Sequence, residues 1–311
     1  MDHERTGWLA RVGLILALVP VIGACGGGTA TVPPTAPTVA STPTPTFETL
    51  EADLDVGGRT MHLLCIGHAN PTHPTVVFEG GLGDDARGWS GVLARLGSTD
   101  RGCAYDRAGQ GRSAPPPGPR TTEDQVADLA KLLEVAGIQT PIVLVGWSLG
   151  GWNAMVYADR HPADVAGIVL IDVRPPNASA RWLAELPPET AGESEALKGN
   201  RAEFTTFEAD PSLNPEALDL HASSAQAAAA DFGGRPVTFL WAKDTSDVWA
   251  GLDPDLAARL DAVSAAVRQE LEAKAPSARS TVVDGTHDIA GDHPDAVADA
   301  IREMLEALTA A

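Results

Sequence analysis

The stretch that decides the fold is "VGWSLGG", residues 145–151, in which an apolar run ends at a serine flanked by glycines. The run before it has the composition of a buried strand, and "SLGGWNAMVYADRH" reads as a helix that ends at Pro162. Ser148 is therefore expected at a sharp turn from strand to helix that pushes its hydroxyl outward. Glycine suits positions 146 and 150 because a side chain there would clash across the turn, so the pattern predicts an exposed nucleophile.

Similar apolar runs recur along the chain from about Phe47, with helical segments between them. Strands are predicted on either side of a hairpin turn at Gly57-Gly58. Further strands are predicted at 75–79, 102–106, 141–146, 166–172, 236–242 and 279–285. Such alternation predicts a doubly wound α/β fold with a mostly parallel sheet.

The clearest helix between these strands follows Arg120. Thr122 and Gln125 have the spacing of a capping box, the apolar positions that follow share one helix face, and Gly137 provides a stop. We therefore predict a helix that begins at Thr122 and ends at Gly137.

A serine nucleophile needs a base, and His287 is the best placed of the eight histidines. It follows the last predicted strand, within "VVDGTHDIAGDHPDAV", on a loop at the carboxyl end of that strand. Open α/β sheets carry their sites at this edge, and histidine comes last in chain order in this motif class.

Three segments together resemble the α/β-hydrolase fold superfamily, in its esterase, lipase and haloperoxidase-like branch. They are residues 75–113, the serine turn and "GTHDIAGDHPDAV", and the resemblance extends over roughly Phe47 to Ala311. It implies structural roles for Asp106, Arg107 and Ser113 in "YDRAGQGRS".

One departure from the family concerns the loop after the 75–79 strand. Related chains often carry His-Gly where this chain has Gly80-Gly81, which alters how the loop is braced. The resemblance implies two backbone donors for the oxyanion of an acyl-transfer reaction: the amide of Leu149 and that of Leu82, with Gly81 as the alternative.

The acid that would orient His287 is left open by the sequence. Asp244 follows the 236–242 strand, where most of the family carries the acid, and Asp247 lies three residues further on. Asp172 ends the 166–172 strand, at the position that some lipases use. We favour Asp172 because no glycine precedes Asp244, and keep Asp244 as the alternative.

The first 46 residues have the composition of an export signal and a tether. Basic residues precede thirteen mostly apolar ones, too few to span a bilayer, and "IGAC" at 22–25 resembles a lipobox. We expect residues 1–24 to be a lipoprotein signal peptide and Cys25 to carry lipid. Ordinary signal cleavage and an uncleaved anchor are the alternatives. Residues 25–46, rich in threonine and proline, read as a disordered tether.

Residues 47–172 and 236–311 are expected to form the hydrolase core, and 173–235 a helical cap inserted after the sixth strand. In the family such a cap covers the site and influences the choice of substrate. Candidate lid side chains, which could equally form the cap's own small core, are Trp182, Leu183, Phe204 and Phe207.

Cys65 and Cys103 fall in two predicted strands of a chain expected to be exported. Adjacent strands in an oxidising compartment favour a disulfide, with two buried thiols as the alternative. The sequence has no metal-binding spacing of cysteine or histidine, and we expect no metal or cofactor. The formal charge of −20 argues against nucleic acid as a partner.

These features predict an exported, lipid-anchored serine hydrolase that acts on a small ester or related acyl substrate. The membrane would be contacted through the N-terminal anchor alone. Two alternatives stay open: a cofactor-free haloperoxidase or perhydrolase with the same triad, and a catalytically silent binding module of the same fold.

Overall fold

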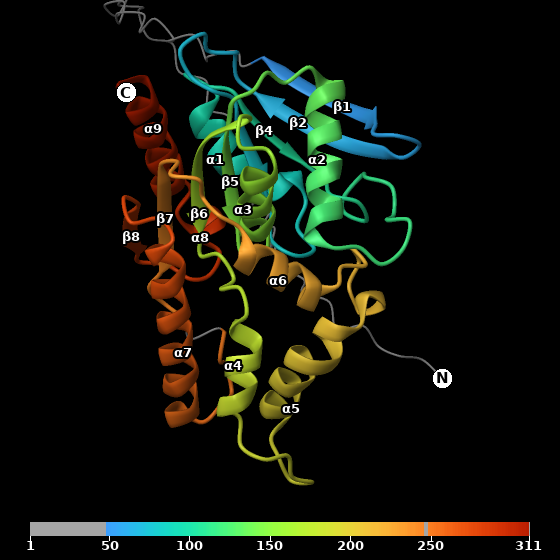
Figure 1. The fold of residues 1–311 in the computed structure, drawn as a ribbon, viewed down its shortest axis with the longest axis vertical. Coiled ribbons are helices and arrows are strands. Elements are labelled where there is room, and N and C mark those ends of the chain that lie inside the picture. Colours follow the sequence, from blue (N-terminus) through green and yellow to red (C-terminus); the bar gives the residue numbers. More distant parts are fainter. Residues whose placement is uncertain (1–47, 246–247, 311) are drawn as a thin grey trace, which may run out of the picture. The chain divides into compact units, whose positions relative to one another are not determined.

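The strands of the computed structural model, which describes residues 48–245 and 248–310, form one mixed sheet (Figure 1). The expected signal peptide, tether and Cys25 lie outside the described residues, as does Asp247. Among those described, the strand order is β1-β2-β4-β3-β5-β6-β7-β8. The bounds are β1 Thr49–Asp55, β2 Thr60–Ile66, β3 Val76–Glu79, β4 Gly102–Tyr105, β5 Ile142–Trp147, β6 Val165–Ile171, β7 Val237–Ala242 and β8 Arg279–Val283.

Only β2 pairs antiparallel, with β1 and β4, and all other neighbours pair parallel. The predicted fold class, the strand runs and the hairpin at Gly57-Gly58 are thus confirmed. The inner strands β3 to β5 are buried apart from the last residue of β5, as expected for strands covered on both faces. Their carboxyl ends meet at one sheet edge, where the site residues lie.

Helices cover both faces of the sheet (Figure 1). One face carries α2, α3 and α6, which contact one another, and the other carries α1, α8 and α9. Separate apolar clusters fill the two faces. The helix bounds are α1 Ser90–Leu96, α2 Thr122–Ala136, α3 Gly150–Arg160, α4 Ala178–Glu185, α5 Glu195–Ala202, α6 Leu220–Ala229, α7 Pro254–Ala273, α8 Ile289–Asp292 and α9 Pro294–Ala310.

Helix α2 begins where it was expected, but its cap lies one residue earlier. The N-cap is Thr121, whose amide donates to Asp124 Oδ2 at 2.8 Å, so the predicted Thr122–Gln125 capping box is wrong. Thr122 and Gln125 are instead buried in the protein interior. The Thr122 amide donates a hydrogen bond to Ser223 Oγ at 3.0 Å. The predicted stop is confirmed: Gly137 has a φ of 65°, a left-handed conformation that suits glycine.

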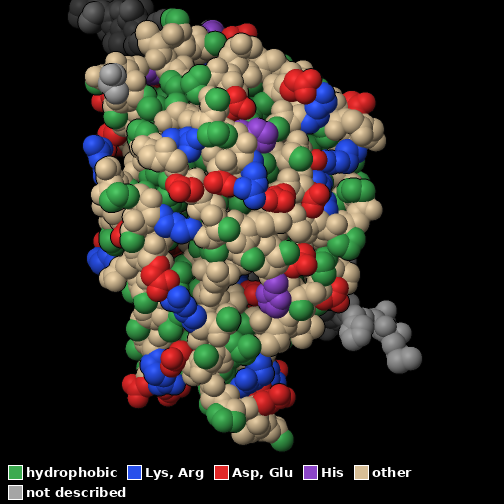
Figure 2. Space-filling model, in the orientation of Figure 1, with side chains coloured by type: hydrophobic (Ala, Val, Ile, Leu, Met, Phe, Trp, Pro, Cys, Tyr) green, Lys and Arg blue, Asp and Glu red, His purple; other side chains and the backbone are tan. Residues whose placement is uncertain are grey.

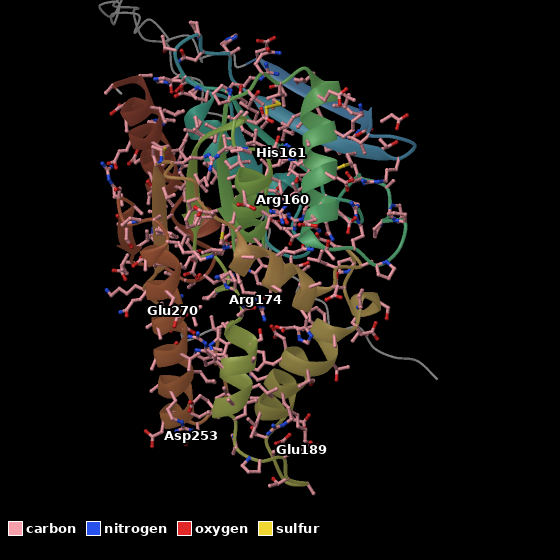
Figure 3. All side chains as sticks on the ribbon, in the orientation of Figure 1. Arg160, His161, Arg174, Glu189, Asp253 and Glu270 are labelled. Carbon is pink, nitrogen blue, oxygen red and sulfur yellow. A yellow bond between two sulfur atoms is a disulfide. The ribbon has the colours of Figure 1, made fainter. Side chains whose placement is uncertain are left out.

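The two parts of the insertion between β6 and β7 pack in different apolar clusters. Trp182 of α4 and Phe204 pack with Leu260 and Val267 of α7 in a third apolar cluster, beyond the edge of the sheet. Residues after Leu218, by contrast, pack in the main cluster beneath α2 and α3. The helical layer over the site is therefore α4, α5 and the far part of α7. Figure 3 marks its outer end with Glu189 and Asp253.

A disulfide joins Cys65 of β2 to Cys103 of β4. The two residues face each other directly in the antiparallel register, with their Cα atoms 4.0 Å apart, and both side chains are buried. The bond therefore ties the antiparallel edge of the sheet to its parallel part.

Candidate active site

Ser148 occupies a strained turn between β5 and α3. Its φ is 52°, which is uncommon for a residue other than glycine, and its amide donates to the Ile171 carbonyl of β6 at 3.1 Å. A Cβ on Gly146 would lie 2.7 Å from the Gly150 carbonyl, as the clash argument expected. A Cβ on Gly150 would instead collide with the carbonyls of Glu79 and Gly80 at the end of β3. The turn is thus held between two neighbouring strands.

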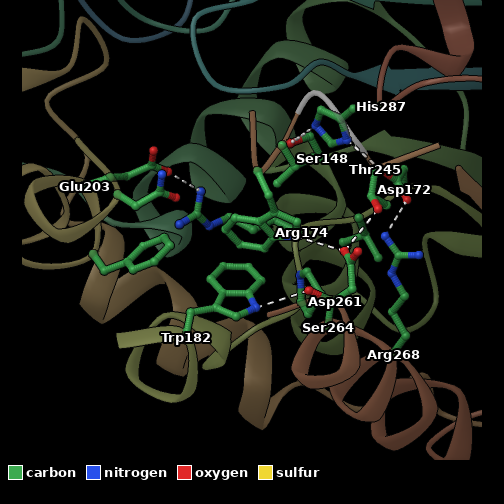
Figure 4. A pocket seen from close by; sticks show the side chains of 16 residues that line it. Ser148, Asp172, Arg174, Trp182, Glu203, Thr245, Asp261, Ser264, Arg268 and His287 are labelled. Carbon is green, nitrogen blue, oxygen red and sulfur yellow. Dashed lines mark hydrogen bonds and ion pairs between the residues drawn. The ribbon is translucent and has the colours of Figure 1, made fainter. Parts of the chain in front are cut away.

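The structure brings three of the predicted site residues into one hydrogen-bonded chain (Figure 4). His287 Nε2 lies 3.0 Å from Ser148 Oγ, and His287 Nδ1 lies 2.7 Å from Asp172 Oδ2. The side chain of Asp172 is 5% exposed and that of His287 is 34% exposed, so the acid is shielded while the imidazole edge faces solvent. This arrangement can pass a proton from the serine to the imidazole while the carboxylate holds the ring.

The carboxylate of Asp172 is fixed on its other side as well. Asp172 Oδ1 accepts hydrogen bonds from the Ala242 amide and from Arg268 Nη2, both at 3.1 Å. The Arg268 guanidinium also lies over the Trp241 ring, 4.8 Å from its centroid. Asp172 Oδ2 is thereby turned toward His287. Arg268 comes from α7, and no motif of the sequence connects it with Asp172.

Of the two candidate acids, Asp172 is the one that contacts the imidazole. Asp244 meets the His287 loop through its backbone, since its amide donates to the Gly285 carbonyl at 3.0 Å. Both aspartates follow parallel strands at the same sheet edge, which is why the sequence could not separate them.

Trp147, which the sequence did not single out, supports the histidine loop. Its Nε1 donates to the His287 carbonyl at 2.8 Å, and the two rings lie 5.3 Å apart. A Cβ on Gly81 would lie 2.9 Å from the Trp147 ring, so the same indole also contacts the loop after β3. The only feature of the sequence that could have pointed to Trp147 is its position at the end of a strand predicted to be buried.

The loop at 80–83 carries the expected oxyanion amides of Gly81 and Leu82. The buried Arg107 guanidinium donates to the Gly80 carbonyl at 2.7 Å and to the Gly81 carbonyl. The structural role that the resemblance implied for Arg107 is therefore a direct brace of this loop. A guanidinium holds the backbone where related chains often carry histidine.

Glu216 of the insertion completes this brace. Its carboxylate accepts hydrogen bonds from Arg107 Nε at 2.7 Å, Gln125 Nε2 at 2.6 Å and the Gly83 amide at 2.9 Å. The side chain is buried, so the pair with Arg107 lies in the interior. The insertion thus holds the loop after β3, which lies beside the serine turn at Trp147 and Gly150. No spacing rule connects these positions.

Glu79, the last residue of β3, lies beside this pair and is fully buried. It accepts hydrogen bonds from the Tyr105 hydroxyl and from Asn153 Nδ2. Burial raises the pKa of the Glu79 carboxyl, and the guanidinium of Arg107 opposes that shift. The buried carboxylates of Glu79 and Glu216 are therefore both hydrogen-bonded inside the protein, whereas Asn153 Oδ1 and Gln125 Oε1 have no hydrogen-bond partner among the described residues.

A cavity of about 290 Å³ opens from Ser148 and His287 into the helical layer (Figure 4). Its apolar walls are Val173, Pro175, Trp182, Phe204, Val248 and Trp249. Two of the expected lid side chains, Trp182 and Phe204, therefore line it. The other two do not: Leu183 packs in the third cluster and Phe207 against the main one.

Two other kinds of feature are absent from the described residues. Residues 48–245 and 248–310 hold no group of three or more His, Cys, Asp or Glu side chains arranged to bind a metal ion. No helix in these ranges is both long and apolar enough to cross a membrane.

Fold and site together match one large class of enzymes. The model of the "Alpha/beta hydrolase family" matches residues 76–300, and the chain belongs to this family. It is accordingly a hydrolase of that fold.

Individual relatives are similar over part of their length. Esterase Rv0045c of Mycobacterium tuberculosis is 34% identical over 137 residues, which are 44% of each chain. In eight curated relatives, the matched segments span between 18% and 52% of the relative's length.

Two solved structures share the fold at low identity. A thermophilic esterase from Thermogutta terrifontis has a TM-score of 0.53 and 21% identity, with 84% of this chain and 99% of that chain covered. A haloalkane dehalogenase variant from Bradyrhizobium elkanii has a TM-score of 0.59 and 17% identity, with 85% and 98% covered.

Proposed function

We propose that the chain cleaves carboxylic esters through a Ser148–His287–Asp172 triad. The observation that carries the proposal is the hydrogen-bonded chain from Ser148 Oγ through both imidazole nitrogens to Asp172 Oδ2. The similarity to a mycobacterial esterase supports an ester as the substrate.

The proposed reaction has two halves. Ser148 Oγ attacks the ester carbonyl carbon while its proton passes to His287 Nε2, and the alcohol then leaves with that proton as the acyl–oxygen bond breaks. Water next attacks the acyl-enzyme and gives a proton to His287, which returns it to Ser148 Oγ as the carboxylic acid is released. Asp172 keeps Nδ1 protonated and stabilises the imidazolium in both halves.

Negative charge builds on the carbonyl oxygen in each tetrahedral intermediate. The amides of Leu149 and Leu82 are proposed to hold it, with Gly81 as the alternative donor in the second position. The brace formed by Arg107 and Glu216 supports this assignment, because it fixes the backbone of the loop before any substrate binds.

A fluorophosphonate probe tests the nucleophile, together with a panel of p-nitrophenyl esters of increasing acyl length. We expect one label per chain, lost in Ser148→Ala together with ester cleavage and retained in the exposed-serine control Ser277→Ala. Labelling that persists in Ser148→Ala would refute the nucleophile. A silent binding module would take up no label.

We further propose that the enzyme is exported and anchored through lipid on Cys25. The lipobox-like stretch at 22–25 supports this, as does the Cys65–Cys103 disulfide, since such bonds persist in oxidising compartments. Cys25→Ala should release the protein from membranes or leave the precursor uncleaved. An intact-mass measurement that finds no lipid on the N-terminus of the mature protein would overturn the anchor.

A further inference from the structure

Three aromatic rings form one end of the cavity beside Ser148. Trp182 lies 5.4 Å from Phe204 and 5.5 Å from Trp249, measured between ring centroids, and all three residues are at most 6% exposed. One of these rings already holds a cation, because the guanidinium carbon of Arg174 lies 5.6 Å from the Trp182 centroid. Aromatic faces attract cations through the ring quadrupole, and this attraction strengthens where water is excluded.

The cationic side chains that line the cavity are already paired. Arg174, which lies between the sheet and α4 (Figure 3), pairs with Glu203 at 3.1 Å and with Glu208. Arg268 pairs with Asp172. Neither guanidinium is available for an anionic substrate group unless one of these ion pairs breaks.

One acidic side chain of the cavity differs from the others. Asp261 of α7 is partly buried and accepts hydrogen bonds at Oδ1 from Thr245 Oγ1 at 3.0 Å and from Trp249 Nε1 at 2.8 Å. Within residues 48–245 and 248–310 it forms no ion pair. Its carboxylate therefore has no opposite charge within ion-pair distance among these residues, and it lies beside the aromatic rings on the same wall as Ser264 and Arg268 (Figure 4).

On the face shown in Figure 2, acidic and basic side chains are interspersed. We propose that the cavity binds an alkylammonium group of the ester substrate, with Asp261 supplying the opposite charge and the three rings packing against the alkyl groups. This inference rests on the proposed ester hydrolysis. The cationic group can belong to the acyl part or to the alcohol part of the ester.

The test compares each cationic ester with its neutral carbon isostere at constant ionic strength. For the acyl part, the pair is p-nitrophenyl 4-(trimethylammonio)butanoate and p-nitrophenyl 5,5-dimethylhexanoate. For the alcohol part, the pair is acetylcholine and 3,3-dimethylbutyl acetate. We expect kcat/KM for the cationic member of one pair to exceed that of its isostere about tenfold, the scale of one partly desolvated cation–π contact with a nearby carboxylate.

Asp261→Asn should reduce this preference to within about twofold, because the negative charge is lost while the amide oxygen can still accept from Trp249 and Thr245. Asp255→Asn is the matched control, since Asp255 is an exposed aspartate of the same helix and its loss changes the net charge equally. It should leave the preference intact. Equal rates within both pairs, or a preference that survives in Asp261→Asn, would overturn the proposal.

A binding measurement separates this proposal from the proposed reaction. In Ser148→Ala, tryptophan fluorescence should report choline binding about tenfold tighter than 3,3-dimethyl-1-butanol, and Asp261→Asn should remove the difference. If choline binds with this preference while the wild type cleaves no ester, the cation site stands and ester hydrolysis fails. If the two compounds bind equally, the cation site is wrong even when esters are cleaved.

Discussion

The carboxylate of Glu216 accepts two hydrogen bonds from the Arg107 guanidinium, at 2.7 and 2.8 Å, although the residues lie 109 positions apart in the chain. Both side chains are buried. Arg107 in turn donates to the carbonyls of Gly80 and Gly81. The insertion therefore reaches the backbone of the loop after β3 in two ways, through this buried ion pair and through the hydrogen bond from the Gly83 amide to Glu216.

Removing this pair should affect stability and turnover together. Glu216→Ala leaves the buried Arg107 guanidinium with only its longer ion pair to Glu79, at 3.5 Å, so we expect the free energy of unfolding to fall by up to the about 3–5 kcal/mol that breaking a buried pair typically costs. Urea denaturation measures that loss. We also expect kcat to fall at least tenfold with little change in KM, because the loop amides act in the transition state. In the control Glu193→Ala, which breaks the Arg201 ion pair elsewhere in the insertion, kcat should stay near wild type.

Asp172→Asn should reduce kcat by about 10⁴, because an amide holds the imidazole in the wrong tautomer. Asp244→Asn is the matched comparison at the neighbouring strand end and should retain most of the activity. Circular dichroism and urea midpoints establish that both variants fold. Equal losses in the two variants would contradict the role assigned to Asp172.

Trp147→Phe should slow turnover while keeping the ring contact with His287. The variant loses the hydrogen bond from Nε1 to the His287 carbonyl, worth about 0.5–1.5 kcal/mol, and part of the packing of the indole; the hydrogen bond alone should lower kcat roughly three- to tenfold. Trp152→Phe makes the same chemical change where the indole donates to the Arg174 carbonyl. A comparable fall in kcat for Trp152→Phe would argue against a specific role for Trp147.

Asp84 and Asp85 should respond to pH with opposite signs. Burial raises the pKa of Asp84, so its ionisation destabilises the fold increasingly as the pH rises above its ordinary value of 3.8. The pKa of Asp85 is lowered by hydrogen bonding to Arg87, so its ionisation stabilises the fold. At pH 7, Asp84→Asn should raise the melting temperature and Asp85→Asn should lower it. Both differences should shrink below pH 4 in calorimetric scans.

Replacing Cys65 and Cys103 by alanine should lower the free energy of unfolding by about 4 kcal/mol, as the chain-entropy model gives for a sequence separation of 38 residues. Equilibrium urea unfolding measures the loss. Alkylation of the unreduced protein, isolated from its native host, provides the companion measurement, since two reactive thiols there would exclude the bond in the native enzyme.

Patterns that act over short distances were readable from the chain itself. The strands β3 to β5 are recognisable as apolar runs because both of their faces are buried. The turn at Ser148 is recognisable because only glycine fits at positions 146 and 150 without a clash. The role of His287 could be predicted from the sequence because the carboxyl ends of parallel strands lie at the same edge of a sheet. The start of α2 shows the limit of such reading: Thr122 and Gln125 have capping spacing, but the core buries both, and Thr121 caps the helix instead.

The tertiary structure alone decided which groups meet across long separations. It turned Asp172 toward His287 and fixed it with Arg268 of α7, 96 residues away, whereas Asp244 occupies an equivalent strand end. It also placed Glu216 against the loop at 80–83. Such contacts depend on how the insertion folds back over the sheet, and no local propensity or periodicity encodes that path. The sequence by itself determined the fold class and the positions of the serine and the histidine, because those follow from neighbours in the chain.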